Sequence, residues 1–511
     1  MEQKETYNSL YEYISAKAKP FLKDGGEMDF TISEDFKDNE SNGIPFADGA
    51  YDGIAVYHMG TQGLSDETRE LMINALKIAS TGDKEAADRA FTELGKAQRA
   101  IHVIDPLQDY IIEHKDEIPA KRLYEFAVYA ITRSCDIECV KFGLSILELL
   151  VIDENEELKD VISMLGFSEE FALFALFVML RWSDGNDRIF RLARKTHGWG
   201  RIHAIERLEA DDDRKRKWLL RNGVHNTVMP SYSALSCWNK SGASELLFGD
   251  EELSDEDARG LRDIIDALLD EGPCSGISEI ENSNDALLKF LEKARFSDIT
   301  DFEVVRNILN YNNEDNEQSS NKIDEKCREI LDSEKCREAA LQAVQEGKSI
   351  DLALSLGIDC RDDILKILES DFDNNAHLCR YLMDDKSYRE KALDLFRGKL
   401  PLEAMKAAPS DQLCLGREFG NEHNLTFLIQ ELKPFPLEGA DLLEIALQCA
   451  PPQNRNMALR VLGEWTGATG DPLQKLLPEM FALLKGLVEN EPNERTRVRM
   501  TELINGELGD K

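Results

Sequence analysis

Several motifs that mark common classes of enzyme are missing from this sequence of 511 residues. It has no GxxxxGK(S/T) phosphate loop, no GxGxxG after a strand, no HExxH, no GxSxG nucleophile elbow and no EF-hand loop. Carboxylates are so numerous that pairs at helical spacing are expected by chance, so they do not indicate acid–base catalysis. The sequence therefore predicts no cofactor and no catalytic residue, and it leaves open an enzyme without a recognisable motif.

Long apolar runs and export signals are missing as well. The longest apolar run, FALFALFVML at 171–180, is about half the length that a membrane-spanning helix needs, and it predicts a helix buried on all sides. The first residues, MEQKETYNSLYEY, have neither the basic nor the apolar region of a secretory signal. A cytoplasmic protein without a membrane segment is the resulting expectation.

The ten cysteines include no CxxC pair. Their scatter along a long chain predicts reduced thiols. Cys135 and Cys139 have the spacing of one helix face and could form half of a metal site, but no second pair or matching His follows. We therefore interpret them as core or cap residues and predict no metal site.

Charge of one sign dominates the chain. The 98 acidic residues exceed the 61 basic residues and give a formal net charge of −37. Such a surface repels phosphate, so bulk affinity for DNA, RNA or anionic lipid is not expected. With 42% hydrophobic and 31% charged residues, the sequence still has enough apolar content to fold.

Helical periodicity is the main structural pattern. Residues 119–134 place apolar side chains at i, i+3, i+4, i+7 and i+8. Residues 137–152 bring Val140, Gly143, Leu144, Leu147 and Leu150 onto one face of a second helix. The two segments predict an antiparallel helix pair. ALRVLGEW at 458–465 overlays GLSILELL at 143–150 as small, Leu, polar, aliphatic, Leu. A long succession of short helices without convincing strands predicts stacked helix pairs.

This array resembles the HEAT and armadillo class of α-solenoids. The resemblance implies an all-α fold of stacked helix pairs, and it implies a scaffold that holds a protein or peptide along a concave surface. It identifies no particular binding residue. Four segments are expected: a capping segment at 1–63, a helical repeat region at 64–248, an acidic helix-and-loop region with a linker at 249–322, and a second repeat region at 323–511.

The N-terminal segment interrupts the helical pattern. Within residues 23–60, EMDFTI and GIAVYHM alternate between apolar and polar residues as strands do. We expect an irregular segment or a small β-hairpin that caps the first helices. A substrate-binding lid is the functional alternative.

Cationic residues gather at 181–221, a segment called the cationic island below. It has twelve Lys or Arg against seven Asp or Glu, a local charge of +5, so the rest of the chain carries −42. Trp182, Trp199 and Trp218 lie in it and Trp238 lies close to it, out of five tryptophans in all.

If the island forms helices, its cations fall on one face of a helix and form cationic stripes. One helix should carry a stripe over residues 188–195; a second, from about Gly200, should leave His203 outward; and a third, from about 211, should carry a second stripe. Arg201 should project with apolar residues and need a carboxylate partner. The candidate binding residues are Arg188, Arg191, Arg194, His197, Trp199, Arg201, His203, Arg207, Arg214, Lys217, Trp218 and Arg221.

The corner Gly198-Trp199-Gly200 has two interpretations. The N-terminal amides of the second helix could meet an anion. Alternatively, Gly198 ends a helix with positive φ and Trp199 fills a gap between helices. The stripes are likewise open to two interpretations: they bind a partner, or they are solvated faces paired with the chain's own carboxylates.

The functional hypothesis is a scaffold whose cationic groove binds an acidic peptide or a phosphorylated protein, because Arg and Trp are enriched at binding hot spots. Nucleic-acid binding through the same stripes is the second hypothesis, and the net charge of −37 disfavours it. An enzyme with its site between the N-terminal aromatic segment and the island is the third.

Overall fold

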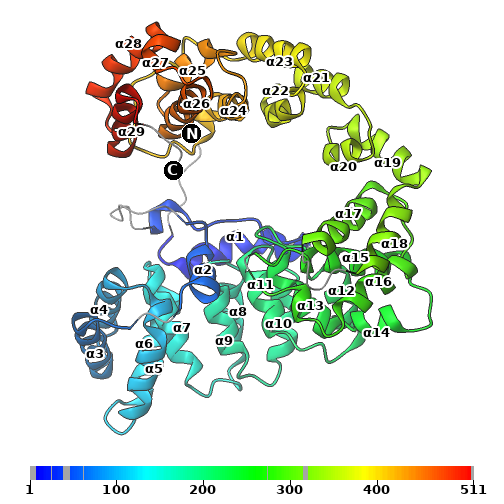
Figure 1. Ribbon diagram of the computed structural model, residues 1–511. Coiled ribbons are helices and arrows are strands. Elements are labelled where there is room, and N and C mark those ends of the chain that lie inside the picture. The colour runs from blue at the N-terminus through cyan, green and yellow to red at the C-terminus, as the bar shows by residue number, and fades with distance from the viewer. Residues whose placement is uncertain are drawn as a thin grey trace. The chain divides into compact units, whose positions relative to one another are not determined.

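The computed structural model describes residues 7–24, 26–37, 46–60, 63–272, 274–314 and 320–507, and these residues form α-helices and 3-10 turns without any β-strand (Figure 1). The prediction of an all-α protein is confirmed. The chain forms two compact units: unit 1 comprises Met1–Arg295 and Asn307–Cys327, and unit 2 comprises Phe296–Arg306 and Arg328–Lys511. The four-segment division expected from the sequence stays a prediction.

The helices of the first half are α1 (Leu10–Asp24), α2 (Ala50–His58), α3 (Asp66–Thr81), α4 (Lys84–Ala97), α5 (Ile104–Glu113), α6 (Ala120–Arg133), α7 (Ile137–Glu148), α8 (Glu156–Gly166), α9 (Ala172–Met179), α10 (Gly185–Ala193), α11 (Trp199–Arg207), α12 (Asp213–Asn222), α13 (Ser231–Ser241), α14 (Ala243–Phe248), α15 (Asp255–Leu268) and α16 (Ser283–Lys293). The later helices are α17 (Ile299–Glu314), α18 (Asn321–Leu331), α19 (Glu334–Val344), α20 (Ile350–Ser355), α21 (Arg361–Ser370), α22 (Phe372–Asn375), α23 (Lys386–Lys399), α24 (Gly420–Gln430), α25 (Ala440–Leu447), α26 (Pro452–Thr469), α27 (Leu473–Leu476), α28 (Pro478–Leu487) and α29 (Glu494–Asn505).

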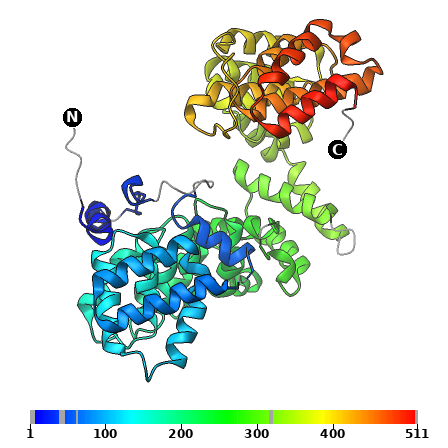
Figure 2. The ribbon, with the colours of Figure 1, turned by 90° about the vertical axis from the view of Figure 1, so that its left-hand side faces the viewer.

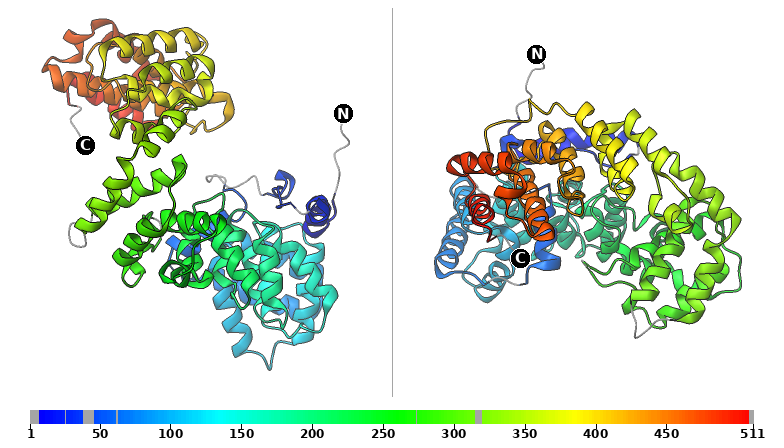
Figure 3. Two further views of the ribbon diagram at one scale, coloured as in Figure 1. Left: turned by 90° about the vertical axis from the view of Figure 1, so that its right-hand side faces the viewer. Right: turned by 45° about the horizontal axis from the view of Figure 1, so that its top comes forward.

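Consecutive helices of unit 1 pack as neighbours. The pairs α3–α4, α6–α7, α8–α9, α10–α11 and α12–α13 are all in contact. These helices follow one another across unit 1 in Figure 1 and in the right-hand view of Figure 3, and Figure 2 looks along the unit from the side of α3 and α4. This arrangement is compatible with a helical repeat fold. Within the described part of the chain, no helix is both long enough and apolar enough to cross a membrane.

The helix pair predicted at 119–152 is confirmed as α6 and α7. α6 buries the five apolar residues of its predicted face, Leu123, Phe126, Ala127, Ala130 and Ile131. The two helices approach closely at Gly143, where an added Cβ would lie 2.9 Å from the Ala130 side chain. Most of the apolar run at 171–180 forms α9, which is buried except for the half-buried Phe177, and Leu180 just after the helix is exposed.

The β-hairpin predicted for the N-terminal segment is wrong. GIAVYHM lies in helix α2, and EMDFTI is an extended segment that pairs with no strand among the described residues. Its alternation is nevertheless real: Met28 and Ile32 are buried and the residues beside them are exposed or half-buried. The segment bonds to other groups, since the Met28 amide donates to the Lys195 carbonyl at 2.7 Å and the Ile32 amide donates to Asp48 at 2.6 Å.

Unit 2 has a core of its own around Trp465, which is fully buried and donates from Nε1 to the Leu432 carbonyl at 2.8 Å. Near the start of α26, which also carries Trp465, the buried Arg455 forms a two-bond ion pair with the buried Glu491 at 2.8 and 2.7 Å. A cavity of about 130 Å³ borders this pair and is otherwise lined mainly by Ala407, Pro409, Leu447 and Leu487.

Candidate functional site

The cationic island lies on three consecutive helices, α10, α11 and α12. The third helix, expected from about 211, begins at Asp213, and the Asp212 side chain accepts from the Lys215 amide at 2.8 Å and caps it. On α10, Arg188 is half-buried, whereas Arg191 and Arg194 are exposed at the end of the helix. The predicted stripe therefore has one shielded member and two that reach solvent.

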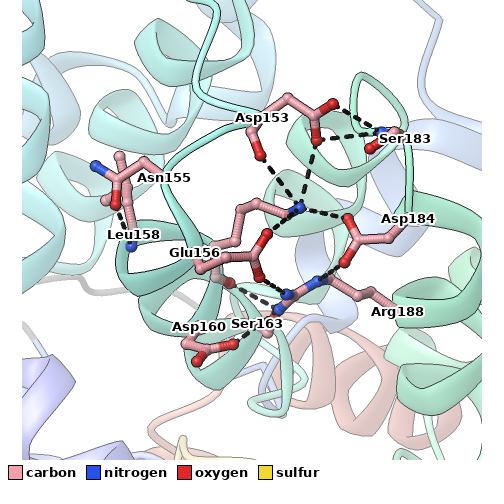
Figure 4. A network of polar contacts seen from close by, with 10 residues as sticks. Asp153, Asn155, Glu156, Leu158, Asp160, Ser163, Ser183, Asp184 and Arg188 are labelled. Atoms are coloured by element: carbon pink, nitrogen blue, oxygen red, sulfur yellow. Dashed lines mark hydrogen bonds and ion pairs between the residues drawn. The ribbon is translucent and has the colours of Figure 1, made fainter.

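Arg188 belongs to a network that neutralises part of the island (Figure 4). Its guanidinium donates to Asp184 at 2.7 Å, to Asp160 at 2.9 Å and to Glu156 at 2.7 Å. The buried Lys159 adds a second cation, with Nζ 2.6 Å from Asp184 and 2.8 Å from Glu156. Burial opposes the charge of Lys159, but its hydrogen bonds to these carboxylates raise its pKa above the usual value.

The second stripe is also partly neutralised. Arg221 forms ion pairs with Asp257, at 2.8 Å, and with Glu256. The buried Lys215 lies within 3.1 Å of three carboxylates, those of Asp187, Asp211 and Asp212. For Arg188 and Arg221, the interpretation as cations paired with the chain's own acids fits the contacts.

The corner at Gly198-Trp199-Gly200 binds an anion, and this anion is the chain's own Glu169. One carboxylate oxygen accepts from the amides of His197 at 3.1 Å and Gly198 at 3.0 Å, and the other accepts from the amide of Gly200 at 2.5 Å. A carboxylate at a helix N-terminus is favoured by the free amides and by the helix dipole. The positive φ considered for Gly198 is wrong, because its φ is −110° and it precedes α11.

Arg201 is buried among protein groups, as the sequence required. Its guanidinium donates to the carbonyls of Ala193 at 3.1 Å and His225 at 2.6 Å, and it pairs with the carboxylate of Glu27 in the N-terminal segment. Trp218 lies beneath it, with the ring centroid 5.8 Å from the guanidinium carbon. Arg201 therefore joins α11 to the N-terminal segment.

His203 was predicted to point outward, and this is wrong. His203 is 1% exposed, and its ring contacts the rings of Tyr57 and Trp199 at centroid distances of 6.1 and 5.9 Å. The Tyr57 and Trp199 rings are 5.9 Å apart, so the three rings form a triangle. Helix α2, which carries Tyr57, can pack against Trp199 because Gly53 has no side chain. A Cβ at Gly53 would lie 2.2 Å from the Trp199 ring. Burial, and then the charge of Arg207, lower the pKa of His203 to about 3, so the ring is neutral.

Arg207 and His197 are also bonded within the protein. Arg207 donates to the His203 carbonyl at 3.0 Å and to Glu206 at 2.9 Å, and its guanidinium lies 4.9 Å from the Phe177 ring. The half-buried His197 ring contacts the Thr227 hydroxyl at 3.2 Å. Both residues fix α11 to its neighbours.

Four exposed cations lie on α10 and α12 or at their ends, and we call Arg191, Arg194, Arg214 and Lys217 the cationic strip. Two of them lie at one ring, with the guanidinium carbons of Arg194 and Arg214 at 5.7 and 5.0 Å from the centroid of Phe190. Arg214 also pairs with Asp187 at 3.3 Å. Trp218 meets the same ring edge-on at 5.6 Å. Among the described residues, no carboxylate lies within 4.0 Å of the charged groups of Arg191, Arg194 or Lys217.

Comparisons with protein-family models, with curated proteins and with solved structures find no match for this chain. The site is therefore defined by the chain's own contacts.

Metal chemistry has no candidate ligand set in the described part of the chain. No group of three or more His, Cys, Asp or Glu side chains there could hold a metal ion. Cys139 is buried, with its thiol 3.2 Å from Asp88, whereas Cys135 is exposed.

Some residues that shape the site have a sequence signal and others have none. Asp211 and Lys215 have the i, i+4 spacing of a helical ion pair, and Glu156 and Lys159 have the i, i+3 spacing, so these neutralising pairs could have been found. Glu27 and Glu169 contact the island from 174 and about 30 residues away, and no local pattern indicates them.

Proposed function

We propose that this protein is an interaction scaffold of the helical-repeat kind, and that it binds an acidic or phosphorylated segment of a partner protein on the cationic strip. The observation that carries the proposal is that Arg194 and Arg214, from two helices, lie at the ring of Phe190, with the exposed Arg191 and Lys217 three residues away from them on the same helices. Arg191, Arg194 and Lys217 have no carboxylate partner among the described residues. The chain has a net charge of −37, so these cations form a positive region on a protein that is acidic overall.

The chemistry of the strip suits a carboxylate or a phosphate. An arginine that lies over an aromatic ring keeps its N–H groups free at the edge of the guanidinium, and these groups bind planar anions through two parallel hydrogen bonds. The ring also holds the side chain in place, which lowers the entropy lost on binding. The acidic surface elsewhere repels an acidic partner and so favours the strip as the place of encounter.

Within this proposal, the buried members of the island have a positioning role. Arg188 pairs with carboxylates of α8, and Arg221 pairs with carboxylates of α15. Arg201 donates to the carbonyls of Ala193 and His225, Arg207 lies at the Phe177 ring of α9, and Trp199 fills the space beneath α2. These contacts fix α10, α11 and α12 to the helices around them. The exposed Arg191, Arg194, Arg214 and Lys217 would make the contacts with the partner.

A charge-reversal experiment tests the proposal. The variant Arg191→Glu, Arg194→Glu, Lys217→Glu is compared with wild type for binding of fluorescein-labelled acidic peptides, with and without phosphoserine, by fluorescence anisotropy at two salt concentrations. The matched control is Arg69→Glu, Lys77→Glu, Arg89→Glu, which reverses three exposed cations of α3 and α4 that also have no ion-pair partner among the described residues.

We expect the strip variant to weaken binding by about tenfold or more, since each exposed charge pair contributes roughly 0.2–1 kcal/mol and reversal replaces attraction by repulsion. The control variant should bind the peptide as wild type does, and high salt should weaken the binding of the peptide to wild type and to the control variant. Equal losses in the two variants would reject the strip as the site. Tighter binding of a single-stranded oligonucleotide than of any peptide would favour the nucleic-acid hypothesis instead.

A further inference from the structure

An acidic segment of the same chain already lies on the cationic island. Residues 26–37, GEMDFTISEDFK, contain four acidic residues and one lysine. Residues 26–32 form neither helix nor strand, Ser33 has extended backbone angles, and burial alternates from residue to residue, as it does along an extended backbone. Met28 is 3% exposed and Ile32 is 1% exposed, and Phe30 between them is half-buried, whereas Glu27 and Asp29 are exposed. The segment is therefore a peptide with one apolar edge and one acidic edge.

Three polar contacts attach the start of this segment to the island. The Met28 amide donates to the Lys195 carbonyl at 2.7 Å, and the Lys195 ammonium donates to the Gly26 carbonyl at 2.7 Å. Glu27 pairs with the buried guanidinium of Arg201. Burial, and then the charges of Arg191 and Arg194, lower the pKa of Lys195, which places Lys195 in the electrostatic field of the cationic strip.

An apolar contact adds to these bonds. The Met28 side chain packs in a small cluster with Ala18 of α1 and Phe167, and the partly buried Phe21, Leu22 and Met164 lie around it. The guanidinium of Arg191 lies 5.5 Å from the centroid of the Phe167 ring. The cluster that holds Met28 and the cationic strip are therefore adjacent, with Phe167 contacting both.

We propose that this surface is a docking site for an extended acidic peptide with apolar side chains at alternate positions, and that residues 26–30 of the chain occupy it until a partner segment of that pattern displaces them. The inference rests on the proposed function, and it specifies the class of partner and the regulation of the same surface. The partner would place an acidic residue at Arg201, an apolar side chain in the Met28 cluster, and further acidic residues toward the strip.

The charge of residues 26–30 and their covalent link to the island both support them as the occupant of this surface. The island is the region where cations exceed acids, and the segment that covers its edge is acidic and extended, which is the chemistry expected of the partner. A tethered segment competes at an effective concentration on the order of millimolar, so it weakens the apparent affinity of a free peptide by a large factor. Loss of the tethered contacts should remove that competition.

The test uses the full chain and a synthetic labelled peptide with the sequence GEMDFTIS. Its binding to wild type is compared with its binding to the variant Glu27→Lys, Met28→Ser, which weakens the tethered segment and leaves Arg201, Lys195 and Phe167 unchanged. We expect the variant to bind the peptide at least tenfold more tightly than wild type. A control peptide, GKSDFTIS, should bind neither protein. Equal binding to both proteins, or binding to neither, would overturn the inference.

Two further measurements keep the outcomes distinct. Hydrogen exchange in wild type should show the Met28 amide exchanging at least a hundredfold faster than the amides of α11, because the segment must detach; equally slow exchange would overturn the inference even if the variant failed to fold. Reversing Arg191, Arg194 and Lys217 in the Glu27→Lys, Met28→Ser background separates the two proposals. Peptide binding that survives this reversal would retain the Met28 site and reject the strip.

Discussion

Lys141 is a buried ammonium whose removal should have a large and pH-dependent effect. The side chain is 0% exposed, and Nζ lies 2.6 Å from Glu170, 2.7 Å from Asp52 and 3.4 Å from Glu138. Burial, opposed by the charge of Lys141, raises the pKa of Asp52 to about 7. The network links α2 to α7 and to the segment before α9, because Asp52 belongs to α2, Lys141 belongs to α7, and Glu170 also accepts from the Gly49 amide at 2.6 Å.

The substitution Lys141→Met keeps the volume of the side chain and removes its charge. The buried Asp52 and the half-buried Glu138 and Glu170 then remain without their cation, and removal of one partner of a buried ion pair costs about 3–5 kcal/mol. The cost should be greatest at pH 8, where Asp52 is ionised in the unfolded chain. At pH 5 the buried Asp52 can keep its proton, so the loss should fall to about half or less of its value at pH 8.

The assay is urea unfolding followed by tryptophan fluorescence at pH 8 and pH 5. Four of the five tryptophans lie in unit 1, so the signal reports mainly on the unit that contains Lys141. The control is Lys121→Met, which removes an exposed lysine from the neighbouring α6. A loss below about 1 kcal/mol at pH 8, or a loss that grows as the pH falls, would refute the reasoning.

Further predictions concern buried polar groups. In wild type, unit 1 should lose stability as the pH rises from about 4 to 7, because folded Asp52 holds a proton that the unfolded chain releases, and Asp52→Asn should flatten this slope in the same urea assay. Glu169→Ala removes the acceptor of three amides and should cost about 2–4 kcal/mol; unchanged stability would contradict the capping role. His203→Phe should be neutral or stabilise by about 1 kcal/mol in thermal unfolding, because neither ring nitrogen has a hydrogen-bond partner in the described structure; a loss above about 2 kcal/mol would argue otherwise. Arg455→Met leaves Glu491 buried and unpaired and should cost about 3–5 kcal/mol, seen as faster hydrogen exchange in α26; protection equal to wild type would reject this.

The fold could be predicted where the determining pattern is local. The period of apolar residues in 119–134 is a property of one helix, and it predicted the buried face of α6 residue by residue. The strand prediction for the N-terminal segment was wrong because the alternation in EMDFTI indicates only an extended backbone with one buried side. A surface made of helices can cover that side as well as a sheet can. GIAVYHM forms α2, whose contact with Trp199 depends on Gly53, a long-range condition that no local pattern contains.

The sequence predicted where the cations of the site lie in the chain, but it predicted only some of their contacts. Counting charges located the island, and the requirement for a partner at Arg201 followed from its position on an apolar face. The orientation of His203 could not be predicted, because the residue that covers it, Tyr57, comes from a helix nearly 150 positions earlier. The division into shielded and exposed cations likewise depends on carboxylates brought by distant segments, such as Asp257 beside Arg221.

Zero-length cross-linking tests the central claim most directly. A labelled acidic peptide is bound to the full chain and treated with a carbodiimide, which couples peptide carboxylates to lysine amines, and the modified lysines are identified by mass spectrometry. The account predicts that coupling concentrates at Lys217 and at the adjacent Lys195, and that the strip variant loses it while the α3–α4 control variant keeps it. Coupling spread over exposed lysines such as Lys77 and Lys121 in proportion to their exposure would contradict a binding site on the cationic strip.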